Sequence, residues 1–184
     1  PDINDYAALI REVIAPLDCG LLFEPGRYMV GNAGILVTRV IRIKEGQGRC
    51  FVVVDAGMND LLRPALYDAR HRILPLSEAV PDAEESLADI VGPVCETGDC
   101  FAEARPLPPL AEGDLLAICS AGAYGAVMAS TYNNRPLIPE VMVRGDSHAV
   151  VRVRQEAEAL FALERTPGWQ ETGSNRDSNI RNTA

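Results

Sequence analysis

The sequence predicts a mainly β protein, an antiparallel β-barrel or sandwich preceded by the last helix–strand unit of an α/β (TIM-type) barrel. Two observations predict this fold class. From residue 35 onward, short apolar runs rich in β-branched residues recur, each bounded by Gly, Pro, Asn or Asp, as is typical of antiparallel sheets. Before them, one helical pattern is followed by one apolar run that ends in a polar loop, which is the repeating unit of an α/β barrel.

The first 30 residues supply the helix–strand unit. Apolar residues at helical spacing predict a helix over 4–14, with Asn4 or Asp5 as its N-terminal cap. Residues 21–26, LLFEPG, predict a short strand that runs into a Pro-Gly loop. We therefore expect residues 1–30 to be the truncated end of a barrel.

Residues 31–168 are expected to form the β domain. The predicted strands cover residues 35–46, 50–60, 114–125, 135–143 and 148–156. Helical stretches are predicted near 60–70 and 154–165. The polar segment 169–184 has few hydrophobic side chains, so we expect a disordered tail.

Composition excludes several classes of protein. The formal charge of −9 argues against nucleic-acid binding, which needs a basic face. A hydrophobic fraction of 47% and a charged fraction of 23% are ordinary for a soluble globular protein. No apolar run reaches the roughly 18 residues of a membrane span, and no signal segment opens the sequence.

The five cysteines give no metal-site spacing, since Cys95 and Cys100 lie five apart and neither histidine accompanies a ligand pair. An odd, unpatterned set indicates reduced thiols, and hence a cytoplasmic protein without a metal site.

Four segments place unusual polar residues after apolar runs. The first is Glu24-Pro25-Gly26-Arg27, where backbone N–H groups and one guanidinium suit a phosphate or carboxylate. The alternative is an ordinary turn with a surface ion pair. In the second segment, Arg63 and Tyr67 lie four apart and project from one helix face. They could hold a carboxylate and a neighbouring amine, or simply stack on each other at the surface.

The third segment brings Cys95 and Glu96 together in a loop flanked by Gly92 and Gly98. A loop thiol could act as a proton donor or nucleophile, although most lone cysteines are small buried hydrophobic residues. In the fourth, Tyr124 lies between glycines after an apolar strand. The glycines indicate backbone packed closely against a ligand, or a crowded barrel corner.

In order and spacing, these segments resemble the C-terminal portion of the diaminopimelate decarboxylase family, enzymes with an alanine-racemase-like fold that depend on pyridoxal 5'-phosphate. The resemblance covers roughly residues 4–165 and rests on four motifs: EPGR, DAGMNDLLRPALYDARH, GPVCETGD and GAYGAVMASTYNNRP. It implies the conversion of meso-2,6-diaminopimelate to L-lysine and CO2 in lysine biosynthesis. Related decarboxylases acting on carboxynorspermidine, ornithine or arginine stay open, as does a non-catalytic, stand-alone β domain.

The resemblance also implies a role for each motif. Residues 24–27 would help to hold the cofactor phosphate, and Arg27 would also reach the substrate. Arg63 and Tyr67 would bind the distal end of the substrate, Cys95 would donate a proton, and Glu96 would contact the distal amino group. Tyr124 would touch both cofactor and substrate. In this family the cysteine loop is offered across a homodimer interface.

One departure from the family is large. The Schiff-base lysine of the family lies upstream of EPGR, whereas the only lysine here, Lys44, stands in an unrelated context. We therefore expect the chain alone to be inactive and the activity to belong to a longer parent protein.

Overall fold

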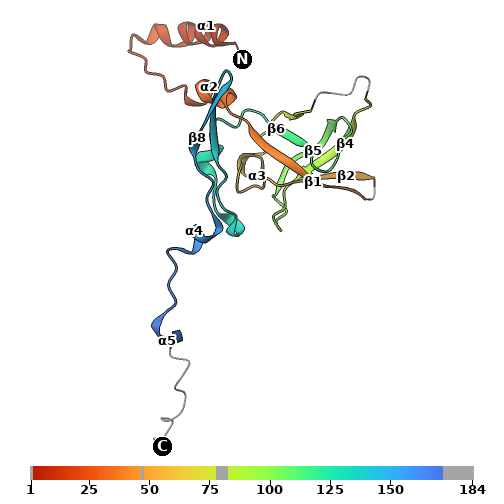
Figure 1. Ribbon diagram of the computed structural model, residues 1–184. Coiled ribbons are helices and arrows are strands. Elements are labelled where there is room, and N and C mark those ends of the chain that lie inside the picture. The colour runs from red at the N-terminus through yellow and green to blue at the C-terminus, as the bar shows by residue number, and fades with distance from the viewer. Residues whose placement is uncertain (1, 47, 78–82, 172–184) are drawn as a thin grey trace, which may run out of the picture.

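The computed structural model describes residues 2–46, 48–77 and 83–171 (Figure 1). Six strands form one sheet in the order β3-β6-β1-β2-β4-β5. Neighbouring strands are antiparallel except for β2 and β4, which are parallel. The strands are β1 (Leu36–Gly46), β2 (Arg49–Val54), β3 (Ile73–Pro75), β4 (Ser86–Val91), β5 (Cys100–Leu107) and β6 (Leu115–Ile118).

The core lies inside this curved sheet. Along β1, Leu36, Thr38 and Val40 are buried while the residues between them are exposed, which is the period of two expected of a strand with one buried face. All six strands contribute to one hydrophobic cluster. The guanidinium of Arg105 on β5 also donates to the carbonyl of His71, just before β3, at 3.2 Å. The outer strands are thus drawn together, and the predicted mainly β, barrel-like fold is confirmed.

A second, two-stranded sheet consists of β7 (Glu140–Arg144) and β8 (Ser147–Arg152). Figure 1 shows this hairpin beside the six-stranded sheet, followed by α4 (Ala157–Phe161) and α5 (Gly168–Glu171), which lead away from it. Glu140 and Arg152 pair across the hairpin at 2.8 Å. Both faces carry exposed apolar side chains, among them Val143 and Val151.

The N-terminal segment consists of α1 (Ile3–Ile14), η1 (Ala15–Leu17), α2 (Gly26–Val30) and η2 (Gly31–Ala33). The predicted helix is confirmed, but its cap is Asp2, which accepts from the N–H of Asn4 at 2.6 Å. The prediction of Asn4 or Asp5 as the cap was wrong because the helix begins before its apolar pattern.

The predicted strand at 21–26 was also wrong. Residues 18–25 have no regular secondary structure. A strand needs hydrogen-bonding groups on a neighbour, and no described strand pairs with this segment.

Three short helical segments complete the fold: α3 (Arg63–Tyr67), η3 (Ala126–Met128) and η4 (Tyr132–Asn134). The helix predicted near 60–70 ends at Asp68, whose φ of 51° is left-handed. The strand predicted over 114–125 ends at Ile118, because Ser120 and Tyr124 also adopt positive φ. No described helix is long and apolar enough to cross a membrane. The predicted disordered tail lies, from residue 172 onward, outside the described residues.

Candidate functional site

A cleft of about 580 Å³ opens between α2, α3 and the loop that follows β6. Three guanidinium groups line it, those of Arg27, Arg63 and Arg70. None of the described residues that line the cleft is an Asp or Glu, although the chain as a whole carries a charge of −9. The cleft therefore suits an anionic group such as a phosphate or carboxylate.

The Arg63 guanidinium lies close to two tyrosine rings at this cleft. Its guanidinium carbon lies 5.8 Å from the centre of the Tyr67 ring and 5.3 Å from that of Tyr124. Both distances are within the range of cation–π contact. The helical spacing predicted the contact with Tyr67; the structure adds Tyr124, from a loop some 60 residues later, to the same cluster.

Glycines bring the Tyr124 loop against the chain that follows α2. The N–H of Gly122 donates to the carbonyl of Gly31 at 3.0 Å, and the N–H of Ala121 donates to that of Gly34 at 2.9 Å. A Cβ on Gly122 would lie only 2.0 Å from the carbonyl oxygen of Val30. The glycines of the GAYG motif thus accommodate close backbone packing, the alternative raised from the sequence.

The EPGR segment is divided between two environments. Arg27 lines the arginine cleft, whereas Glu24 and Pro25 line a separate hollow beneath α1 with Tyr6 and Phe23. Pro25 is the residue before α2, and the N–H of Gly26 is turned back to the carbonyl of Glu24 at 2.9 Å. Only Arg27 of this motif meets Arg63 in one cleft.

The loop that carries Cys95 and Glu96 is exposed and lies on the other side of α3. A Cβ built on Gly98 would be 3.7 Å from the Cβ of Ala65. Ala65 is two residues from both Arg63 and Tyr67, so it projects from the opposite face of the helix. The described chain therefore does not bring Cys95 or Glu96 to the arginine cleft. Cys100, the next cysteine in the sequence, is half-buried, and burial raises the pKa of its thiol.

Asp99 ends this loop and was not predicted as a site residue. It is 4% exposed, and its carboxylate accepts from the N–H groups of Met58 and Val94, each at 2.6 Å. Burial raises the pKa of the Asp99 carboxyl above 3.8, and the two N–H donors oppose that change. Asp99 thus joins the cysteine loop to the turn that precedes α3.

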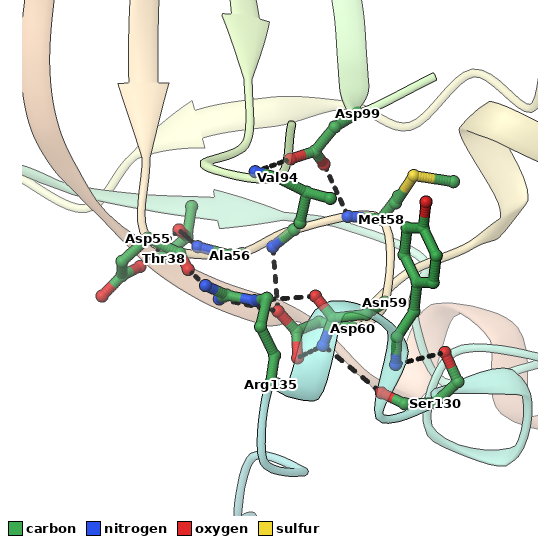
Figure 2. A network of polar contacts seen from close by, with 12 residues as sticks. Thr38, Asp55, Ala56, Met58, Asn59, Asp60, Val94, Asp99, Ser130 and Arg135 are labelled. Atoms are coloured by element: carbon green, nitrogen blue, oxygen red, sulfur yellow. Dashed lines mark hydrogen bonds and ion pairs between the residues drawn. The ribbon is translucent and has the colours of Figure 1, made fainter. Parts of the chain in front are cut away.

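That turn, residues 55–60, is held by a network centred on Arg135 (Figure 2). The guanidinium of Arg135 donates to the side-chain oxygen of Asn59 at 2.9 Å and to the carbonyl of Asp55 at 2.6 Å, and lies 3.6 Å from the carboxylate of Asp60. Asp60 also accepts from the N–H of Gly57 at 2.9 Å. Burial raises the pKa of Asp60, while Gly57 and Arg135 act in the opposite sense.

Three further hydrogen bonds extend the network shown in Figure 2. The hydroxyl of Thr38 on β1 donates to the carboxylate of Asp55 at 2.7 Å and accepts from the N–H of Ala56 at 2.9 Å. The N–H of Ser130 donates to the carbonyl of Asn59 at 2.9 Å. The sheet, the turn before α3 and the loop before β7 are thereby fixed to one another.

Asn59, Asp60, Asp99 and Arg135, which hold these loops in place, were not predicted from the sequence, although all four lie within the quoted motifs. Their repeated clustering of Asp, Asn and Gly was a signal for a structured turn. Within the described ranges, no group of three or more His, Cys, Asp or Glu side chains could hold a metal ion.

Comparison with known proteins gives a match to one family model, described as "Pyridoxal-dependent decarboxylase, C-terminal sheet domain", over residues 17–122. A diaminopimelate decarboxylase of Zymomonas mobilis subsp. mobilis is 51% identical over 169 residues, which is 92% of this chain and 39% of that protein. The chain thus spans about two fifths of the length of this relative.

Solved structures agree. Diaminopimelate decarboxylase from Helicobacter pylori, complexed with L-lysine, aligns with a TM-score of 0.78 and 43% identity over 89% of this chain and 40% of that one. The arginine decarboxylase of Paramecium bursaria Chlorella virus, bound to agmatine, aligns over 70% of this chain and 36% of that one, with a TM-score of 0.61 and 23% identity. This second likeness shows a common fold alone.

Proposed function

Because the chain belongs to the family of pyridoxal-dependent decarboxylases through their C-terminal sheet domain, we propose that it is the C-terminal part of a diaminopimelate decarboxylase. The whole enzyme would convert meso-2,6-diaminopimelate to L-lysine and CO2. The observation that supports this substrate most strongly is the 51% identity over 92% of the chain to a protein of that name.

The arginine cleft fits the charge of the expected cofactor and substrate. Pyridoxal 5'-phosphate, when bound, supplies an electron sink for the pair left by a departing carboxylate. Its phosphate is an anion, and the cleft offers guanidinium groups with no acidic lining among the described residues. Arg27 and the EPGR loop, Glu24 to Gly26, would lie toward the phosphate, with Tyr124 beside the ring.

Arg63 and Tyr67 would bind the distal end of the substrate, and Tyr124 would contact both the substrate and the cofactor. Diaminopimelate carries an amino and a carboxylate group at both ends, so the enzyme needs a second recognition site. The contacts with two rings fix the orientation of the Arg63 guanidinium, whose planar edge suits a carboxylate. Glu96 would take the distal amino group, whose charge is complementary. Ornithine lacks the distal carboxylate and would leave Arg63 without its partner.

Cys95 would be the proton donor. Decarboxylation breaks the bond to one carboxylate, CO2 leaves, and a new C–H bond forms with the proton of the Cys95 thiol. Water then returns a proton to the sulfur. The exposed position of Cys95 on its loop is compatible with this role, which depends on placing the thiol on one face of the reacting carbon.

Two chains would complete each active site. The loop with Cys95 and Glu96 packs on the face of α3 opposite to Arg63 and Tyr67, so one chain cannot easily present all four groups to one ligand. A homodimer in which the cysteine loop of one protomer reaches the arginine cleft of its partner resolves this separation.

The rest of the parent enzyme would supply what this chain lacks. Lys44 lies on β1, exposed and paired with Phe51, and does not line the arginine cleft. The lysine that bonds the cofactor is therefore expected in the other three fifths of the enzyme. Residues 1–30 would be the end of its barrel, residues 31–168 the β domain and 169–184 a tail. The apolar face of α1, exposed at Tyr6, Leu9 and Val13, supports such a covering domain.

We also propose a cytoplasmic location, which is supported by the five cysteines of this chain, all of them free thiols.

The test is complementation with the missing part. The chain is expressed with the N-terminal portion of the Zymomonas mobilis relative, and CO2 release is measured from meso-diaminopimelate, carboxynorspermidine, ornithine and arginine. We expect release from meso-diaminopimelate alone, and only when both parts and pyridoxal phosphate are present. Turnover of another of the four amines instead, or a folded complex that releases no CO2, would overturn the proposal.

A further inference from the structure

We infer that Asp99 positions Cys95, because this buried residue is hydrogen-bonded to both neighbours of the cysteine. This inference rests on the proposed function in one respect only, the role of Cys95 as proton donor. Nothing in the proposed chemistry uses Asp99 directly, since its carboxylate is buried and engaged with the backbone.

The residues on either side of Cys95 are both bonded to Asp99. On the N-terminal side, Val94 donates its N–H to the Asp99 carboxylate at 2.6 Å. On the C-terminal side, Glu96 accepts the N–H of Asp99 at 3.1 Å through its carbonyl oxygen. The residues before and after Cys95 are therefore both fixed by hydrogen bonds to Asp99, while the Cys95 side chain is exposed.

The loop closes further around this anchor. The N–H of Gly92 donates to the carbonyl of Asp99 at 2.9 Å, and Val94 is itself buried. A Cβ on Gly92 would lie 2.3 Å from each of the Asp99 carboxylate oxygens. Gly92 thus leaves the space that the carboxylate fills, and the GPVCETGD motif has a structural reason for both its first and its last residue.

The second carboxylate oxygen fixes the loop relative to the substrate-binding helix. It accepts the N–H of Met58 at 2.6 Å, and Met58 belongs to the turn that Arg135 holds and that leads into α3 (Figure 2). The position of Cys95 is therefore set against the same turn that sets the position of Arg63. A thiol that must deliver a proton to one face of one carbon needs such a fixed frame.

The first experiment uses the chain itself and needs no activity. Asp99→Asn keeps the size of the side chain but replaces one acceptor oxygen with an NH2 group, which cannot accept from a backbone N–H. We expect hydrogen exchange at the amide of Met58 or Val94 to accelerate by roughly tenfold or more, with increased mobility at Cys95 in heteronuclear NMR relaxation. The matched control is Asp114→Asn, which removes a carboxylate that accepts from Ala111 at 2.7 Å in another turn.

The second experiment uses the complete decarboxylase in deuterium oxide. The product receives one deuteron at the carbon that lost CO2, and the stereochemical purity of that position reports where the donor stands. We expect Asp99→Asn to lower kcat, normalised to bound cofactor, with KM nearly unchanged, and to yield product of mixed configuration. Simple loss of folded enzyme would leave the configuration of the product intact.

The outcomes separate the two proposals. Unchanged amide exchange at both Met58 and Val94, or an effect equal to that of Asp114→Asn, would overturn the positioning role. If exchange accelerates but Cys95→Ala leaves turnover and configuration untouched, the role of Cys95 fails, while the structural tie to Asp99 stands.

Discussion

At the scale of single residues, the arrangement of Arg63 explains why an arginine rather than a lysine occupies this position. A guanidinium can stack on the rings of Tyr67 and Tyr124 through its plane and still present N–H donors along its edge. A lysine ammonium has no such plane. The tyrosines thus orient the cation before any ligand arrives, which lowers the entropy lost on binding.

Substitutions at the two ends of the proposed chemistry should separate binding from proton transfer. In the complete enzyme, Arg63→Ala should raise KM by roughly ten- to hundredfold, the effect of losing a charged hydrogen bond. Cys95→Ala should lower kcat by about a hundredfold or more with little change in KM, because a proton donor acts in the transition state. Arg72→Ala, at an exposed arginine outside the cleft lining, is the control. Equal losses from all three would contradict the assignment.

Asp60 gives a prediction about pH. Burial raises its pKa in the folded chain above 3.8, so between 3.8 and the raised value the folded state binds more protons than the unfolded state. The favourable contribution of the protonated carboxyl is complete below pH 3.8 and is lost as the pH rises through the folded value. The free energy of unfolding of the native chain, minus that of Asp60→Asn, should therefore fall from pH 3.5 to 7 in urea titrations. A difference that rises over this range would contradict the burial argument.

The sequence could predict Arg63 and Tyr67 as a pair, because helical spacing alone puts them on one face. It could not predict the role of Asp99 or Arg135. The sequence does not distinguish an aspartate that is buried against backbone N–H groups from one on the surface, because burial depends on the fold. The contact between Tyr124 and Arg63 was out of reach for the same reason.

At the scale of elements, the long strand β1 was predictable because alternation marks one buried face. By contrast, β3 has three residues and carries no pattern, and β4 and β5 were missed. The left-handed φ of Ala104, within β5, is a local distortion that a pattern of side chains does not record. The strand predicted at 21–26 failed because apolar character alone cannot supply a partner.

The contact between the chain after α2 and the loop after β6 depends on Gly122, and this can be tested. Gly122→Ala would place a Cβ 2.0 Å from the Val30 carbonyl oxygen, so the two backbones must separate. We expect a loss of about 2 kcal/mol and a fall in Tm of roughly 5 °C by calorimetry. Gly46→Ala, where nothing lies within 4 Å of the added Cβ, is the control and should cost less than about 1 kcal/mol. Equal effects at both positions would contradict this account.

At the scale of the whole molecule, exposed apolar surface collects on α1 and on the β7–β8 hairpin rather than on the six-stranded sheet alone. Leu9 and Val13 on α1 and Val143 on β7 are all more than half exposed. Surfaces of this kind are interaction sites in a soluble protein. The arginine cleft and the cysteine loop lie on opposite sides of α3. Together with the exposed apolar surfaces, this agrees with the proposal that the active site is assembled from several parts, two of which this chain would supply.

A shared site makes a prediction that a site within one chain does not. At substrate concentrations below the native KM, complete enzymes carrying Arg63→Ala or Cys95→Ala should each be nearly inactive. Mixing and reassociating them should produce heterodimers in which one of the two sites has both native groups. Random pairing makes about half of the dimers mixed, so about a quarter of native activity should return. Mixing Arg63→Ala with Tyr67→Ala is the control: both residues come from the same protomer, every mixed site carries one lesion, and no activity should be regained. Recovery in the control, or none in the first mixture despite exchange of subunits seen by native mass spectrometry, would show that each chain builds its own site.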